Sequence, residues 1–169
     1  MKNIKMAWQS NNRISKSHRD LEVKQVYCWV ITKDSKILVV SKDGENWQLP
    51  GGKPNSANEN IQSTVVREIE EETGLDLEYY KNSIEIFGYY IVSENQDTKD
   101  NIFLQIRTKI SIYIDSDDLS LEPQEDESQD ESDKIKYVKA VTINQLVSLI
   151  PWMKSTGEYK VISLDLLYE

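Results

Sequence analysis

Four glutamates gather at the end of one helical segment, just before a glycine that would stop it. They are Glu68, Glu70, Glu71 and Glu72, and the glycine is Gly74. The C-terminus of a helix already carries about half a negative charge, so each anion in the last turn costs roughly a few tenths of a kcal/mol. A purely supporting helix would carry Lys or Arg there. The pattern predicts that a cation offsets these charges, and a divalent metal is the simplest candidate.

Helical geometry places three of these carboxylates together. Glu68 and Glu72 share one face, one turn apart, and Glu71 adjoins them, whereas Glu70 points away. Carboxylate oxygens without nitrogen or sulfur ligands suit Mg²⁺ or Mn²⁺. The alternative is a solvated acidic face, which is what most charge runs are. The helix end, the glycine-rich loop before it and Arg67 favour a metal site.

The segment from about residue 60 to residue 73 must form the helix that presents these groups. Its apolar positions repeat at helical spacing: Ile61, Val65, Val66 and Ile69. Two start signals compete for its N-terminus. Ser56 with Glu59 resembles a capping box, and Asn60 is also a good N-cap. We favour Asn60, because the loop before it looks irregular.

The other elements indicate an α/β protein. The expected strands cover residues 23–32, 36–41, 83–93, 102–114 and 135–141, with the first two forming a hairpin. Polar loops are expected at 95–100 and at the strongly acidic segment 115–134. Thr142 should cap a helix that ends at Ile150, and residues 157–168 could form a last helix. Residues 1–20 show no clear period and fit an arm, an edge strand or a partly disordered segment. We expect a mixed-sheet α/β sandwich in a single domain over residues 1–169.

Composition narrows the classes of function. The net charge of −9 argues against extended nucleic-acid binding, although a small phosphorylated substrate stays compatible if a metal reverses the local field. No apolar stretch is long enough to span a bilayer, so we expect no membrane partner. The N-terminus lacks a signal peptide's apolar region, and a cytoplasmic location is expected by default. The single cysteine, Cys28, is expected to be a small buried hydrophobe rather than a reactive thiol.

The residues around the glutamates resemble the Nudix hydrolase family. The family's box is a glycine, five residues, a glutamate, seven residues, then Arg-Glu-apolar-x-Glu-Glu-x-Gly-apolar. Residues 67–75 match its second half at every fixed position, and Glu59 stands seven residues before Arg67. One departure is that six residues, not five, separate Gly52 from Glu59. The extra residue falls in the loop 53–58, where insertions are tolerated.

The resemblance implies a fold, a chemistry and a set of roles. Members are α/β/α sandwiches around a mixed sheet that hydrolyse a nucleoside diphosphate linked to another group, so the implied partner is a small-molecule nucleotide and the cofactor Mg²⁺ or Mn²⁺. Relatives are often homodimers, which makes a homodimer a possible assembly. By resemblance, the metal ligands are Glu68, Glu71 and Glu72, the box-orienting pair is Glu59 and Arg67, and the substrate-binding bend is Gly51, Gly52 and Lys53.

The catalytic set that we predict is Arg67, Glu71 and Glu131. The proton acceptor is either a glutamate of the box or a carboxylate of the loop before the last strand. Within that loop Glu131 is favoured by its position before the strand. The remaining candidates are Glu127, Asp130 and Asp133, with Glu94 as a weaker one.

Two further features carry open alternatives. His18 could be a phosphate clamp or part of a solvent-exposed basic segment. Several aromatic side chains could stack on a base, although we expect core positions for each: Tyr27, Trp29, Trp47, Phe87, Tyr89, Tyr90 and Trp152.

Two rival functions remain beside the hydrolase: a Nudix-fold module that binds nucleotide without turnover, and an acidic protein–protein adaptor that needs no metal.

Overall fold

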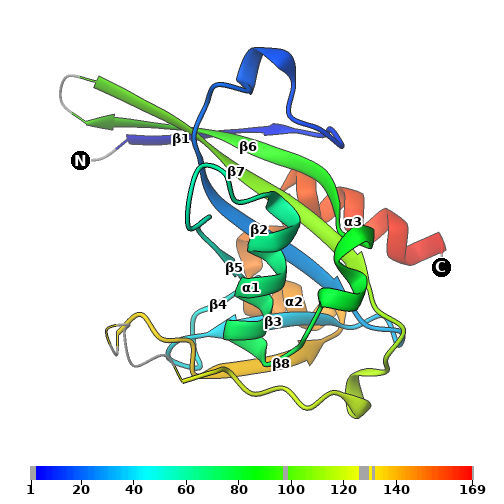
Figure 1. The fold of residues 1–169 in the computed structure, drawn as a ribbon. Coiled ribbons are helices and arrows are strands. Elements are labelled where there is room, and N and C mark those ends of the chain that lie inside the picture. The colour runs from blue at the N-terminus through cyan, green and yellow to red at the C-terminus, as the bar shows by residue number, and fades with distance from the viewer. Residues whose placement is uncertain (1–2, 97–98, 126–129, 131, 169) are drawn as a thin grey trace.

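Eight strands form one mixed sheet in the computed structural model, which describes residues 3–96, 99–125, 130 and 132–168 (Figure 1). The strands are β1 (Asn3–Gln9), β2 (Val23–Ile31), β3 (Ile37–Ser41), β4 (Trp47–Gln48), β5 (Gly51–Gly52), β6 (Glu85–Gln96), β7 (Lys99–Ser111) and β8 (Tyr137–Val141). The main order is β1-β6-β7-β2-β3-β4, while β5 pairs with β2 and β8 pairs with β3. Strands β2 and β7 run parallel and the other pairs run antiparallel. The predicted mixed sheet and the β2–β3 hairpin are confirmed.

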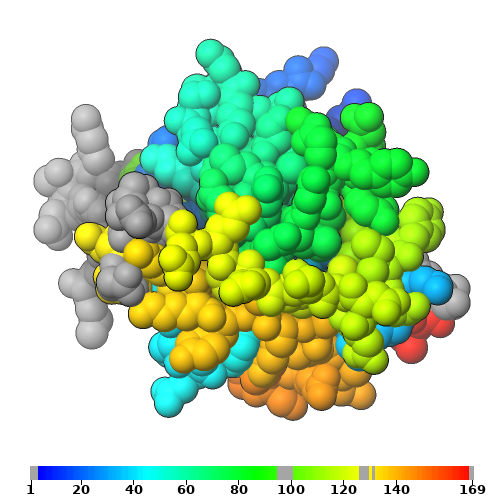
Figure 2. Space-filling model, turned by 60° about the horizontal axis from the view of Figure 1, so that its bottom comes forward, coloured from blue at the N-terminus to red at the C-terminus, as the bar shows by residue number. Residues whose placement is uncertain are grey.

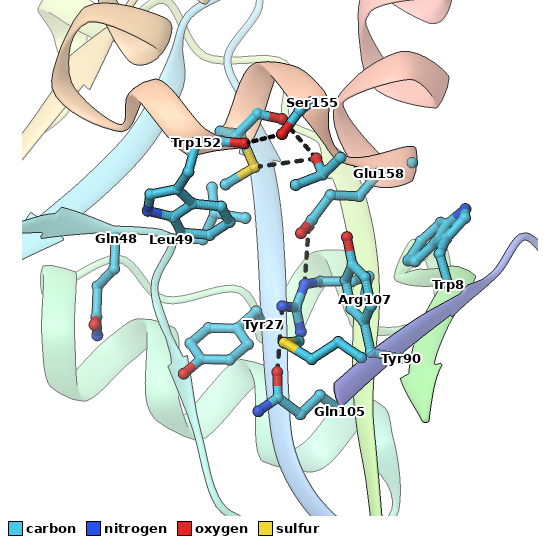
Figure 3. A pocket seen from close by; sticks show the side chains of 14 residues that line it. Trp8, Tyr27, Gln48, Leu49, Tyr90, Gln105, Arg107, Trp152, Ser155 and Glu158 are labelled. Atoms are coloured by element: carbon cyan, nitrogen blue, oxygen red, sulfur yellow. Dashed lines mark hydrogen bonds and ion pairs between the residues drawn. The ribbon is translucent and has the colours of Figure 1, made fainter. Parts of the chain in front are cut away.

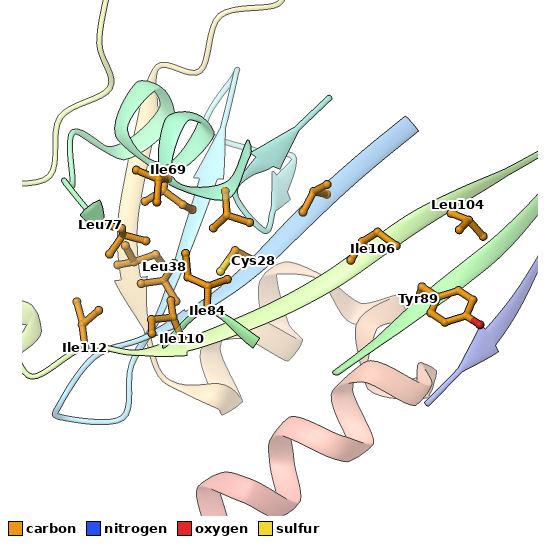
Figure 4. Packing of buried hydrophobic residues seen from close by; sticks show 14 residues of the cluster. Cys28, Leu38, Ile69, Leu77, Ile84, Tyr89, Leu104, Ile106, Ile110 and Ile112 are labelled. Carbon is orange, nitrogen blue, oxygen red and sulfur yellow. The ribbon is translucent and has the colours of Figure 1, made fainter. Parts of the chain in front are cut away.

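Helices cover both faces of this sheet. On one face α1 (Ile61–Thr73) packs on Cys28 and its neighbours in a large apolar cluster (Figure 4). On the other, α2 (Ile143–Leu149), the 3-10 turn η4 (Pro151–Ser155) and α3 (Gly157–Tyr168) pack around Trp29. Successive β2 residues alternate between the two clusters, as the pleat of a strand requires. The expected α/β/α sandwich is therefore confirmed.

Local signals set both ends of α1. The Asn60 side chain accepts a hydrogen bond from the backbone N–H of Ser63 at 2.7 Å, so Asn60 is the N-cap, as predicted, and Ser56 is not. At the other end Gly74 adopts the left-handed conformation with φ 73°, and its N–H donates to the carbonyl of Glu70.

The acidic segment after β7 also contributes to this helix end. We predicted a solvated acidic loop, and this is wrong for Leu119 and Leu121, which pack against the core. The backbone N–H groups of Glu122 and Gln124 donate to the Thr73 and Glu71 carbonyls at 2.9 and 2.8 Å. They satisfy carbonyls that α1 itself leaves without partners. Figure 2 shows this yellow-green segment lying between the green surface of the α1 region and the gold and orange surface of β8 and α2.

The structure decides three further expectations, two near the N-terminus and one at the β6–β7 hairpin. The structure selects the edge-strand alternative for residues 3–9, since β1 pairs with β6. His18 is neither a free clamp nor simply exposed, because its Nδ1 lies 2.9 Å from the Tyr89 hydroxyl. The polar loop expected at 95–100 is wrong: β6 continues to Gln96 and β7 starts at Lys99, because cross-strand pairing outweighs the low strand propensity of polar residues.

The described helices are all short. Within residues 3–96, 99–125, 130 and 132–168, none is long and apolar enough to cross a membrane.

Candidate active site

Arg67 organises the acidic end of α1. Its Nη1 lies 2.7 Å from the Glu68 carboxylate and 3.4 Å from that of Glu71. Its Nε and Nη2 donate to the two oxygens of Glu59, both at 3.2 Å, and Nη2 also donates to the Lys53 carbonyl at 2.9 Å. One guanidinium thus joins the helix to the loop before it. The pairing of Arg67 with Glu59 agrees with the orienting role that the resemblance implies.

Glu59 fixes the loop that contains the extra residue. Its Oε2 accepts hydrogen bonds from the Asn55 backbone N–H at 2.7 Å and from the Thr64 hydroxyl at 3.0 Å. These bonds, with Arg67 first among them, lower the pKa of Glu59 to about 2. The loop is held to α1 at both of its ends, so the added residue is accommodated without loss of the Arg67–Glu59 contact.

The two box glycines lie against the helix at positions where a Cβ would meet neighbouring groups. The Gly51 N–H donates to Oε2 of Glu72 at 2.8 Å. Gly51 has φ 148°, and a Cβ there would collide with the carbonyl of Val26. A Cβ on Gly52 would collide with the Glu68 carboxylate. Strand β5 therefore passes directly beside two of the three predicted metal ligands.

The carboxylates of this site are only partly compensated. Burial raises the pKa of Glu72 to about 8, against the hydrogen bond from Gly51, and the nearby charges of Glu68 and Glu71 add to the rise. Burial also raises the pKa of Glu68, although Arg67 acts in the opposite direction. The site therefore retains an electrostatic demand for further positive charge. A set made only of carboxylate oxygens fits a hard dication such as Mg²⁺ or Mn²⁺.

In this structure the three carboxylates form ion pairs or hydrogen bonds with other groups of the chain. Within the part of the chain that the structure describes, no three acidic, histidine or cysteine side chains stand as a ready metal cage. Arg67 contacts Glu68 and Glu71, and Gly51 contacts Glu72. Glu70 is exposed and points to Gln124, away from the group, as predicted. The metal ligand set stays a prediction.

Only some of the candidate proton acceptors lie among the described residues, and these differ in their distance from the site. Glu131, which we favoured, and Glu127 lie outside the described residues. Asp130 is exposed, and Asp133 pairs with Lys42 at 3.0 Å. Lys42 is near enough to the helix end to lower the pKa of Glu72, which brings the Asp133 region towards the site. Glu94 lies in the β6–β7 hairpin, opposite Asn101.

A pocket of about 630 Å³ lies on the sheet face opposite α1, and we call it the aromatic pocket (Figure 3). Tyr27 and Arg107 line it, whereas their strand neighbours Cys28 and Ile106 pack in the α1 cluster. Fourteen residues line it: Met6, Trp8, Tyr27, Gln48, Leu49, Tyr90, Gln105, Arg107, Trp152, Met153, Ser155, Thr156, Gly157 and Glu158. Three of the aromatic residues that we expected in the core line this pocket: Tyr27, Tyr90 and Trp152. Tyr90 is nevertheless buried, as Trp29 is, so both predictions are confirmed, whereas Trp152 is 60% exposed and its predicted core position is wrong.

Two charged residues of this pocket were not predicted from the sequence. Arg107 and Glu158 form an ion pair at 2.8 Å and both are almost completely buried. The available signal was the placement of Arg107 between apolar positions of a long strand, and that of Glu158 after Gly157 at the start of a helix. Neither signal identifies the partner.

Comparison with known proteins agrees with this architecture. The family described as NUDIX domain matches residues 22–163. A mutant of the Bacillus subtilis pyrophosphohydrolase BsRppH has a similar structure, with a TM-score of 0.51 and 20% identity over 79% of this chain and 70% of that chain. The MutT protein of Methanosarcina mazei Go1 (TM-score 0.44, 17% identity, 76% and 83% covered) is more distant. An ADP-ribose pyrophosphatase of Streptococcus suis has a TM-score of 0.43 and 19% identity, with 86% and 91% covered. No curated protein matched.

The match over residues 22–163 spans most of the chain, and the chain therefore belongs to the Nudix family. The resemblance inferred from the box is confirmed. At 20% identity the BsRppH structure bears on the fold alone, and its similarity agrees with the mixed sheet and its flanking helices.

Proposed function

We propose that this protein is a metal-dependent pyrophosphohydrolase that cleaves the diphosphate linkage of a nucleoside diphosphate joined to another group. One observation supports this most directly. Arg67, Gly51 and Gly52 hold the three box glutamates beside a glycine strand, and two of those carboxylates keep a raised pKa. A supporting helix would have no reason to keep such charges.

Each residue has a role in this proposal. Glu68, Glu71 and Glu72 would hold Mg²⁺ or Mn²⁺. When bound, such a metal neutralises charge on the diphosphate and makes water a stronger nucleophile. Gly51 and Gly52 let the backbone approach the phosphates closely, because neither has a Cβ. Lys53 is exposed beside them and would attract the anionic substrate.

The proton of the attacking water needs an acceptor within hydrogen-bond reach. Glu71 is the box carboxylate best placed for it, because its side chain is 38% exposed and its contact with Arg67 is the longer one, at 3.4 Å. Glu131 is the second candidate. Arg67 serves the site by keeping the loop and the carboxylates in place.

A substrate panel tests this proposal. Nucleoside triphosphates, nucleoside diphosphate sugars, ADP-ribose and dinucleoside polyphosphates are incubated with Mg²⁺, with Mn²⁺ or with EDTA, and the products are separated. We expect cleavage of at least one compound between two phosphorus atoms, and none with EDTA. Tight nucleotide binding without product would favour a binding module instead, and no metal dependence of any kind would favour the adaptor.

A further inference from the structure

The aromatic pocket is lined by aromatic side chains that could stack on a flat ring. Trp8 and Tyr27 reach into it from β1 and β2, and Trp152 reaches it from η4 (Figure 3). Trp152 is 60% exposed, so it stands at the mouth rather than in the core. Aromatic side chains of this kind stack on the face of any nucleobase.

Two polar atoms in this pocket have no hydrogen-bond partner among the described residues. Oε2 of Glu158 accepts from the Trp29 indole N–H at 3.0 Å and from Nε of Arg107 at 2.8 Å. Neither its other oxygen, Oε1, nor the Tyr90 hydroxyl makes a hydrogen bond of good geometry with a described residue, although Thr156 and Glu158 lie near enough to affect the pKa of Tyr90. The Glu158 side chain is completely buried, and Tyr90 is 8% exposed. A buried polar group left without a partner costs about 1–3 kcal/mol, so two in one pocket call for an explanation.

Arg107 does not make this pocket a phosphate site. Its guanidinium lies between the rings of Tyr27 and Tyr90, 4.6 and 4.9 Å from their centroids, and pairs with Glu158. The charge of Arg107 is thus already balanced. What the pocket offers to a ligand is an unused carboxylate oxygen beside a hydroxyl, which calls for an N–H donor.

The pocket adjoins the box. Gln48 and Leu49 line it and lead through Pro50 into β5, while Tyr27 pairs with Gly51 in the sheet. Burial chiefly raises the pKa of Tyr27, and the charges of Glu72 and Glu68 contribute to the rise. The Tyr27 side chain therefore lies within the field of both the pocket and the glutamates. A nucleotide with its base in the pocket would direct its phosphates towards β5 and α1.

We propose that the aromatic pocket binds the base of the substrate and selects a base with an exocyclic amine, which donates to Oε1 of Glu158 beside the Tyr90 hydroxyl. The substrate class is thereby narrowed to adenine, guanine or cytosine nucleotides. This inference rests on the proposed function for the position of the phosphates. It assigns Glu158 and Tyr90 as specificity-determining residues, since a site built to bond an amine disfavours the analogue without it.

Matched nucleotide pairs test the selection. ATP is compared with purine riboside triphosphate, which lacks only the 6-amino group, and GTP with ITP, which lacks only the 2-amino group. CTP is compared with pyrimidin-2-one riboside triphosphate, which lacks only the 4-amino group. Binding is followed by tryptophan fluorescence with EDTA and with Mg²⁺, and kcat/KM is measured separately. We expect at least tenfold tighter binding of the amine-bearing member in one pair. Equal binding within all three pairs, or no binding of any nucleotide, would overturn the pocket assignment.

The Tyr90→Phe variant shows whether the residues act as proposed. Because the hydroxyl has no partner, its loss should leave the melting temperature unchanged or higher, whereas Glu158→Gln would strand the Arg107 charge. We expect Tyr90→Phe to reduce the discrimination at least threefold. The matched control is Tyr113→Phe, at an 82% exposed tyrosine outside the pocket, which should discriminate as the parent does. Unchanged discrimination in Tyr90→Phe would overturn the proposal.

The two proposals fail separately. Hydrolysis without preference within any pair would leave the proposed function intact and remove the pocket assignment. Amine-selective binding with no hydrolysis would do the reverse.

Discussion

The backbone N–H of Gly51 donates a hydrogen bond to Oε2 of Glu72 at 2.8 Å. This bond joins the short strand β5 to the last turn of α1. The negative charge of Glu72 is unfavourable there for two reasons, the partial negative charge of the helix C-terminus and the burial of the carboxylate. One backbone donor offsets part of that cost, and the pKa of Glu72 still rises to about 8. The glycine strand and the acidic helix end therefore form one unit.

A side chain at Gly52 should displace the Glu68 carboxylate. A Cβ at this position would collide with the Glu68 carboxylate, so Gly52→Ala must displace Glu68 or the strand. We expect kcat to fall at least tenfold with little change in far-UV circular dichroism. Asn58→Ala, at an exposed position of the loop that follows β5, is the control and should behave as the parent. Full activity of Gly52→Ala would show that the position of Glu68 is unimportant.

Arg67→Lys should be a damaging change despite its conserved charge. A lysine ammonium cannot reach Glu59, Glu68 and the Lys53 carbonyl in the planar arrangement that the guanidinium uses. We expect a loss of about 1–3 kcal/mol in the free energy of unfolding, measured with urea. We also expect at least a tenfold loss of kcat. The exposed pair Lys81–Glu78 supplies the control: Lys81→Arg should change neither quantity measurably.

Asn60→Ala should affect stability far more than chemistry. The Asn60 side chain caps α1 through the Ser63 N–H, and loss of such a cap costs about 1 kcal/mol. Thermal melting should show the loss, while kcat should stay within about twofold of the parent because the glutamates lie at the opposite end. An unchanged melting temperature would mean that α1 does not depend on this cap.

Cys28 should be inert in the folded protein. Burial raises the pKa of its thiol to about 12, so the reactive thiolate is scarce at pH 8. A thiol-specific chromogenic reagent should react at least a hundredfold faster in guanidinium chloride than in buffer. Rapid reaction of the native protein would contradict the buried position.

Local sequence signals predicted the parts of the fold that depend on neighbouring residues. Asn60 and Gly74 could be predicted as the two ends of α1, because helix capping depends only on residues within about one turn of each end. The box glutamates, Arg67 and Glu59 are likewise close in sequence, so their spacing predicted the cluster that the structure shows.

Long-range pairing accounts for what could not be predicted. The strand at residues 3–9 forms only because β6 offers it an edge, and its own sequence has no clear pattern. The bonds from Glu122 and Gln124 to α1 join segments far apart in the chain. Arg107 and Glu158 are 51 residues apart in the sequence, and the residues around either one do not indicate that the two form a pair.

The central claim is that Glu68, Glu71 and Glu72 hold a divalent metal, and titration calorimetry with Mn²⁺ tests it most directly. We expect the parent protein to take up Mn²⁺ and the folded Glu72→Gln variant to bind it at least tenfold more weakly, with turnover at least a hundredfold lower. Glu70→Gln, on the exposed side of the same helix, should bind Mn²⁺ as the parent does. Equal Mn²⁺ affinity in the parent and Glu72→Gln, or no uptake by the parent even with nucleotide present, would contradict the account.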